Sequence, residues 1–175
     1  ERDGSLWLYY GDEAFGPYDD IGRISGPVWS SDREQPALVF SPDGGSIAFR
    51  ARIGESWYIV YGQRRYGPYE KVDRGFLVSP DGASVAYGAS IDGAWYAMRN
   101  GIAVGGPYES IGYDEKGYDS GIWYRSDSVC SFDGEGDSLL YAVKKSGKSY
   151  LMRGNRETGP FDFIVCLTQS EDRAK

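Results

Sequence analysis

Residues 77–87 read LVSPDGASVAY, and this stretch decides the fold of the chain. Apolar β-formers flank a central Ser-Pro-Asp-Gly. Proline fixes φ near the value that the first central position of a tight turn requires, and aspartate tolerates the next position and bonds back to the backbone. Gly82 accepts the left-handed conformation that follows. The stretch therefore predicts two antiparallel strands joined by a turn.

The same stretch recurs along the chain. Residues 39–49 read VFSPDGGSIAF, and a degraded third copy reads VCSFDG at 129–134 and closes with SLLY at 138–141. In the second strand of each copy, two apolar residues fall on one face at period two. These pairs are Ile47 and Phe49, Val85 and Tyr87, and Leu139 and Tyr141. Three such hairpins predict a repeat architecture.

Two further landmarks recur four times. Strand-like segments begin around Trp7, Trp57, Trp95 and Tyr150, and the proline of a Gly-Pro-aromatic-acid element follows ten to twelve residues later. Because proline has no N–H, we expect a bend there that leads into a short second strand, with the aromatic packed inward and the acid facing solvent. The four elements are Gly16-Pro17-Tyr18-Asp19, Gly67-Pro68-Tyr69-Glu70, Gly106-Pro107-Tyr108-Glu109 and Gly159-Pro160-Phe161-Asp162, each followed shortly by Ile21, Val72, Ile111 or Ile164.

One repeat is a four-stranded antiparallel meander of about 40 residues, the size of a propeller blade. We therefore predict an all-β, β-propeller-like array in a single domain spanning 1–175, with three full units and a partial fourth. The units are approximately 5–53, 54–92, 93–146 and 147–175. Three arrangements stay open: four units close a small ring, the chain is a fragment of a longer propeller, or a partner supplies strands, including a second copy at the open sheet edges.

The repeats also differ in length. From the proline of the Gly-Pro element to the aspartate of the hairpin turn there are 26 residues in units one and three, but 13 in unit two. Units one and three thus share an insertion, and the inserted segments resemble each other, SGPVWSSD at 25–32 and SGIWYRSD at 120–127. The sequence predicts a duplicated pair, a long unit followed by a short one.

The insertions are the predicted binding site. Because they interrupt the meander, we expect long loops on a rigid frame, where binding residues usually lie. They hold aromatic and arginine side chains of the types enriched at binding hot spots. The alternative is that the two tryptophans among them only extend a strand or plug the sheet. The candidate ligand-binding residues are Trp29, Tyr113, Tyr118, Trp123, Tyr124 and Arg125.

No catalytic, cofactor or metal site is predicted. The chain has no histidine, which excludes Ser-His-Asp and Cys-His catalysis and the usual zinc sites. An acid pair of the glycosidase type would stand out from its repeat equivalents, and the recurring acids do not. Calcium at 133–137 is the alternative to a longer turn there. For Cys130 and Cys166 we favour two small buried side chains over a disulfide.

Composition limits the partners. The net charge of −7 argues against nucleic acid, which requires a basic surface, and no apolar run is long enough for a membrane-spanning helix. The stretches 40–49 and 78–87 resemble the WD40-like (PD40) repeat of TolB-type β-propellers, a turn also found in the propellers of prolyl-oligopeptidase-like peptidases. The Trp-Tyr and Gly-Pro-Tyr elements are similar to WG-type bacterial repeats. The resemblance implies a bacterial, periplasmic or otherwise extracytoplasmic, protein-binding propeller, and it carries over no functional residue.

The sequence therefore predicts a non-catalytic β-propeller scaffold that binds a protein or peptide. Two alternatives remain at this stage. Aromatic faces and carboxylates also suit a glycan-binding, lectin-like propeller. The hairpin motif also suits the substrate-gating propeller of a larger peptidase.

Overall fold

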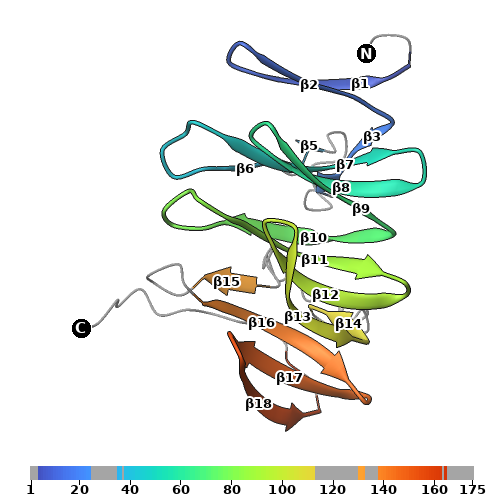
Figure 1. Ribbon diagram of the computed structural model, residues 1–175, viewed down its shortest axis with the longest axis vertical. Coiled ribbons are helices and arrows are strands. Elements are labelled where there is room, and N and C mark those ends of the chain that lie inside the picture. The colour runs from blue at the N-terminus through green and yellow to red at the C-terminus, as the bar shows by residue number, and fades with distance from the viewer. Residues whose placement is uncertain are drawn as a thin grey trace, which may run out of the picture.

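The computed structural model describes residues 4–24, 35–36, 38–112, 130–132, 138–162 and 164. Within these ranges the chain forms strands and turns and no helix, as predicted. Its antiparallel sheets lie face to face in a stack along the longest axis of the molecule (Figure 1). None of the sheets in the described part of the chain closes on itself.

We number the sheets as layers one to four in chain order. Layer one has two strands, and each of the other three layers has four strand positions. In layers two and four the first position is occupied by two short strands instead of one. Layer one is β1 (Leu6–Tyr10) and β2 (Glu13–Tyr18). Layer two is β3 (Asp20–Ile21), β6 (Leu38–Phe40), β7 (Ile47–Ile53), β8 (Ser56–Tyr61) and β9 (Arg64–Tyr69); layer three is β10 (Lys71–Val78), β11 (Val85–Ile91), β12 (Ala94–Arg99) and β13 (Ile102–Tyr108); layer four is β14 (Ser110–Ile111), β15 (Cys130–Phe132), β16 (Leu139–Lys145), β17 (Lys148–Arg153) and β18 (Arg156–Phe161). A separate pair is β4 (Arg23–Ile24) with β5 (Gln35–Pro36).

The boundaries between layers do not coincide with the boundaries between the predicted sequence units. The Gly-Pro-aromatic element is the end of a strand (β2, β9 or β13) and does not precede it. One acidic residue then connects two layers: Asp19, Glu70 or Glu109. Each complete layer therefore joins the last two strands of one sequence unit to the first two of the next. Among the described residues, layer one accordingly has only the first two strands of the first sequence unit, β1 and β2.

Three hydrophobic cores lie between the four layers. Each core contains one of the apolar pairs that the period-two pattern placed on a single face of a strand. Ile47 and Phe49 are buried between layers one and two, Val85 and Tyr87 between layers two and three, and Leu139 and Tyr141 between layers three and four. A sheet apolar on both faces cannot be stable alone, so burial between neighbours supplies most of the stability.

One aromatic contact is repeated at each interface. The aromatic of the Gly-Pro element lies against an aromatic in the second strand of the next layer. The ring centroids are 5.7 Å apart for Tyr18 and Phe49, 5.8 Å for Tyr69 and Tyr87, and 6.2 Å for Tyr108 and Tyr141, in tilted or edge-to-face geometry. The inward packing predicted for these aromatics is thus confirmed in the first three elements. Phe161 of the fourth is exposed.

The two complete hairpin turns share one polar network. The Ser41 hydroxyl donates to the Asp43 carboxylate at 2.6 Å and accepts from the Ser46 N–H at 2.8 Å, while the carboxylate accepts from the Gly45 N–H at 2.9 Å. Ser79, Asp81, Ala83 and Ser84 repeat it in layer three. The turn motif Ser-Pro-Asp-Gly is thus closed by the backbone N–H of the residue five positions after its serine.

The strand register corrects the third hairpin copy. Phe132 pairs with Leu139, as Phe40 pairs with Ile47 and Val78 with Val85. Ser131 is therefore a strand residue equivalent to Val39, two positions before the site of the turn serine. The predicted alignment of VCSFDG with the other turns was wrong by two residues, because the pairing of Phe132 with Leu139 places Phe132 at the last strand position before the turn.

Register also corrects the aromatic landmark. Leu6 pairs with Tyr18 as Trp57 pairs with Tyr69 and Trp95 with Tyr108. Trp7 is thus equivalent to Tyr58 and Tyr96, and so is Tyr150, whose neighbour Ser149 pairs with Phe161. The ring at this position covers the glycine of the Gly-Pro element of the same layer: Trp7 over Gly16, Tyr58 over Gly67, Tyr96 over Gly106 and Tyr150 over Gly159.

These glycines leave no room for a side chain. Gly67 has a φ of +134°, and a Cβ there would lie 2.9 Å from the carbonyl oxygen of Trp57 and 2.7 Å from the Tyr58 ring. Both the backbone conformation and the space therefore require glycine.

We expect Gly67→Ala to lower the free energy of unfolding by about 3 kcal/mol, because it combines backbone strain with a clash against a carbonyl. Gly11→Ala is the matched control, since Gly11 has a φ of +58° with nothing within 4 Å. It should lose only about 1 kcal/mol. Urea unfolding followed by tryptophan fluorescence measures both, and equal losses would contradict the close-packing argument.

Candidate binding site

Both insertions begin at the same position of the first strand of a layer, after β3 in layer two and after β14 in layer four. In layer two, β3 and β6 pair with opposite ends of β7, so they are two halves of one edge strand; β14 and β15 divide in the same way along β16. In layer three the equivalent strand, β10, is continuous, but its register is irregular between Val72 and Phe76. The insertions replace this bulge.

The corrected register also corrects the insertion lengths. Three residues separate Val72 from Phe76, whereas sixteen separate Ile21 from Leu38 and eighteen separate Ile111 from Cys130. The insertions are therefore thirteen and fifteen residues long, and not equal as the sequence suggested. Pairing of β4 with β5 closes the base of the first. Because the divided strands lie at the same edge of layers two and four, both insertions begin on one side of the stack.

Arg50 lies at the base of the first insertion. Its guanidinium is 4.9 Å from the centre of the Trp57 ring and donates from Nη1 to the carbonyl oxygen of Val72 at 3.4 Å, so it connects layer two to layer three. Gly22, where the insertion starts, donates its N–H to the carbonyl oxygen of Arg50 at 2.9 Å. A Cβ at Gly22 would lie 2.0 Å from Arg50 Nε, so glycine admits the arginine.

The connecting acids bind the hairpins of the next layer. The carboxylates of Asp19, Glu70 and Glu109 accept hydrogen bonds from the N–H groups of Gly54, Gly93 and Gly147, at 2.6, 3.0 and 3.1 Å. The prediction that these acids face solvent was therefore incomplete, since their exposed side chains hold the next turn. Asp162 instead pairs with Lys148 of its own layer at 2.7 Å.

Hydrogen bonding fixes the charge of several carboxylates. The Ser41 and Ser79 hydroxyls lower the pKa of Asp43 and Asp81, and the Gly93 N–H, followed by the Ser90 hydroxyl, lowers that of Glu70. These recurring acids thus act as hydrogen-bond acceptors, which agrees with the structural role predicted for them.

Sequence reasoning missed two tyrosines that connect layers. The Tyr61 hydroxyl donates to the carbonyl oxygen of Gly82 in the next layer's turn at 2.5 Å, and Tyr10 binds Gly44 in the same way. Burial raises the pKa of Tyr61, which keeps its proton available for donation. The signal was present in the sequence, because β1 and β8 each end in a tyrosine that is followed by glycine, at 10–11 and 61–62.

Every predicted ligand-binding residue lies outside the described residues. This holds for Trp29 in the first insertion and for the five in the second, and also for the segment 133–137 and for Cys166. Cys130 is in β15. The structure therefore places the ends of both insertions at the equivalent edge strand of layers two and four, and the residues within the insertions stay a prediction. They are Trp29, Tyr113, Tyr118, Trp123, Tyr124 and Arg125.

The described residues contain no cluster of metal ligands and no membrane-spanning helix. No group of three or more His, Cys, Asp or Glu side chains is arranged to hold a metal ion there. Within the same residues, no helix is long and apolar enough to cross a membrane. Comparison with family models, with curated proteins and with solved structures found no match in any of the three.

We expect Ser79→Ala to raise the pKa of Asp81 toward its ordinary value, because the hydroxyl is the main cause of its depression and the Ala83 N–H a smaller one. Asp43, in the intact turn of layer two, should keep its lowered pKa. A carboxyl group whose pKa is lower in the folded state than in the unfolded state stabilises the fold at pH values above its unfolded pKa. That stabilisation is lost as the pH falls through the folded-state pKa. The free energy of unfolding of the variant should therefore fall less on acidification than that of the unmodified chain. Carboxyl NMR titration measures both groups; an unchanged Asp81 would refute the assignment.

Proposed function

We propose that this chain is a non-catalytic, β-propeller-like scaffold that binds a protein or peptide partner through its two insertions. The observation that carries the proposal is the origin of both insertions at one edge of the stack, at the same position of layers two and four. Layer three lies between them and has only a bulge there. Two segments that leave a scaffold on the same side can contact one ligand together.

The composition of the insertions supports a protein or peptide as the ligand. They hold tryptophan, tyrosine and arginine, which dominate the energetics of protein interfaces. The layers beneath them have buried aromatic cores and turns held by hydrogen bonds, so the ends of both insertions are held in place. The propeller assignment and a bacterial extracytoplasmic location are supported by the resemblance of residues 40–49 and 78–87 to TolB-type repeats.

A peptide ligand selected from a displayed library against the purified chain provides the test. We expect Trp29→Ala or Trp123→Ala to weaken its binding about 30-fold, which corresponds to the roughly 2 kcal/mol of a hot-spot residue. Fluorescence anisotropy of the labelled peptide measures the affinity.

Ile102→Ala is the control, because Ile102 is exposed on β13, at the opposite edge of layer three from β10. It should bind as the unmodified chain does. If both tryptophan variants keep the original affinity while the folded state is intact, the insertions are not the binding site.

A further inference from the structure

The outer edge of layer three differs from the equivalent edge of the other layers. The last strands of the four layers share one register, in which the first residue is Glu13 in β2, Arg64 in β9, Ile102 in β13 and Arg156 in β18. A charged residue protects an edge strand from unwanted contacts. Ile102 replaces that charge in β13 and is 70% exposed. Because layer three lies between layers two and four, this exposure does not arise at an end of the stack.

β13 also has one residue more than its equivalents. It spans seven residues, whereas β2, β9 and β18 span six, and its register has a second irregularity, between Ala97 and Met98. The additional residue is Val104, which is 41% exposed. A bulge of this kind redirects side chains, and bulges are frequent beside functional sites.

Packing between the layers does not account for the two exposed side chains. The third register position holds Phe15 in β2 and Tyr66 in β9, whose rings lie against Phe49 and Tyr87 of the next layer. In β13 this position is Gly105, where a Cβ would lie 2.1 Å from the Tyr141 hydroxyl of layer four. Contact with layer four is therefore made at the glycine, and the three cores between the described layers contain neither Ile102 nor Val104.

The outer hairpins of layers two and three carry positive charge in an acidic chain. Residues 56–69 and 94–108 contain three arginines, Arg64, Arg65 and Arg99, and no Asp or Glu, although acids outnumber Lys and Arg by 26 to 19 in the whole chain. Arg64 and Arg65 are exposed. Neither forms an ion pair with an acid of the described residues.

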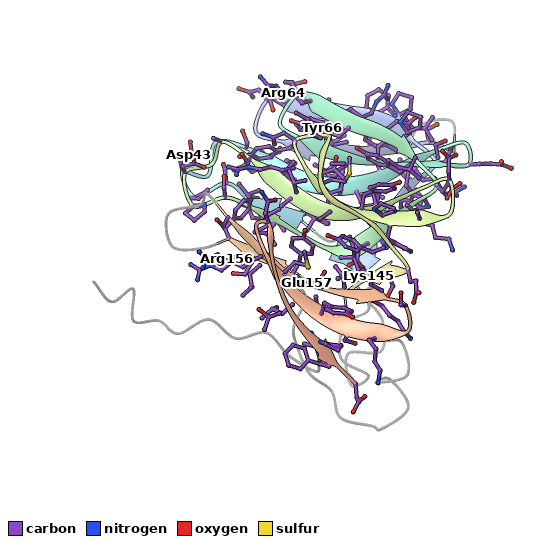
Figure 2. All side chains as sticks on the ribbon, turned by 60° about the horizontal axis from the view of Figure 1, so that its bottom comes forward. Asp43, Arg64, Tyr66, Lys145, Arg156 and Glu157 are labelled. Atoms are coloured by element: carbon purple, nitrogen blue, oxygen red, sulfur yellow. The ribbon has the colours of Figure 1, made fainter. Side chains whose placement is uncertain are left out.

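Arg64 lies close to the start of β13. Tyr66 is two residues further along β9 on the same face, and Figure 2 shows the two side chains near each other. A Cβ at Gly101, the residue before Ile102, would lie 2.8 Å from the Tyr66 ring. The exposed apolar residues of β13 therefore have a basic rim on the side of layer two.

We propose that this outer surface docks an acidic segment of a partner protein. Ile102 and Val104 contact apolar side chains of the segment, and Arg64 and Arg65 face its carboxylates. An apolar centre with a polar rim is the usual anatomy of a protein interface, and opposite charge speeds the encounter. The partner does not add a strand, because the bulge at Val104 and the missing N–H of Pro107 interrupt the ladder that an added strand requires.

The proposed surface is separate from the insertions, which begin at the opposite edge of the sheets, so the inference does not rest on the proposed function. Its test selects peptides from a displayed library against the chain that carries both Trp29→Ala and Trp123→Ala. The selected peptides should be enriched in Asp and Glu beside Leu, Ile or Phe. Fluorescence anisotropy of one labelled peptide measures the affinity, which added salt should weaken.

Ile102→Asp and Arg64→Glu should each weaken the affinity at least about tenfold. A copy of the peptide with lysine in place of its acids should instead prefer the variant that carries Arg64→Glu and Arg65→Glu. Ile102 thus separates the two sites, since its substitution should affect this peptide and not a ligand of the insertions.

Lys71→Glu is the matched control, because it changes the net charge as Arg64→Glu does but lies on β10, at the opposite edge of layer three. It should leave the affinity unchanged. All substituted residues are exposed, so we expect the variants to fold, which thermal unfolding verifies.

Selected peptides without enrichment in acids, or an affinity that Ile102→Asp leaves unchanged, would overturn the proposal. So would binding of the chain to phosphatidylserine vesicles that Ile102→Asp abolishes, which would assign the surface to a membrane. Dimerisation that the same variant abolishes, measured by sedimentation, would assign it to a second copy and overturn the proposal equally.

Discussion

The contact on which this structure depends is the aromatic pair between successive layers. Tyr69 leaves layer two at the end of the Gly-Pro element and lies against Tyr87 in layer three, where the two hydroxyls are 2.8 Å apart. Burial and this hydrogen bond raise the pKa of Tyr87, so the pair stays neutral. The next residue, Glu70, then binds the hairpin of the new layer. Two consecutive residues, an aromatic and an acid, therefore end one sheet, bury a ring between the sheets and bind the next sheet, and the chain repeats this at the junctions after Tyr18 and Tyr108.

This arrangement explains why the layers and the sequence repeats are out of phase. A layer that combined the four strands of one sequence unit would be joined to its neighbour only by a connecting loop. Here each complete layer contains strands from two units, so the acid that connects two layers, such as Glu70 or Glu109, lies at a junction already fixed by backbone pairing. Layer one consists, among the described residues, of β1 and β2, which are the first two strands of the first sequence unit.

The divided edge strand connects the fold to the proposed function. A bulge at Val72 to Phe76 is a place where pairing with β11 is already interrupted, so a longer segment can be inserted without loss of ladder hydrogen bonds. Layers two and four use this site for insertions, while Ile21 and Ile111 remain buried on one side of the gap and the pairing of β6 and β15 resumes on the other. The insertions are thereby accommodated within a single edge strand of each of these two layers, while the paired parts of that strand remain in the sheet.

Local chemistry in the sequence specifies the strands, the turns and the repeat, through the φ of proline, the left-handed conformation of Gly82 and the period-two pattern of Val85 and Tyr87. It also predicts a structural role for the recurring acids, and Asp43, Asp81 and Glu70 accept hydrogen bonds from backbone N–H groups. Which strands share a sheet is known only from the folded structure, since pairing is set by the register between segments distant in the sequence. Register alone showed that Tyr150 corresponds to Tyr58 and that Ser131 is a strand residue. The roles of Tyr61 and Glu70 likewise depend on groups in another layer, which no local pattern specifies.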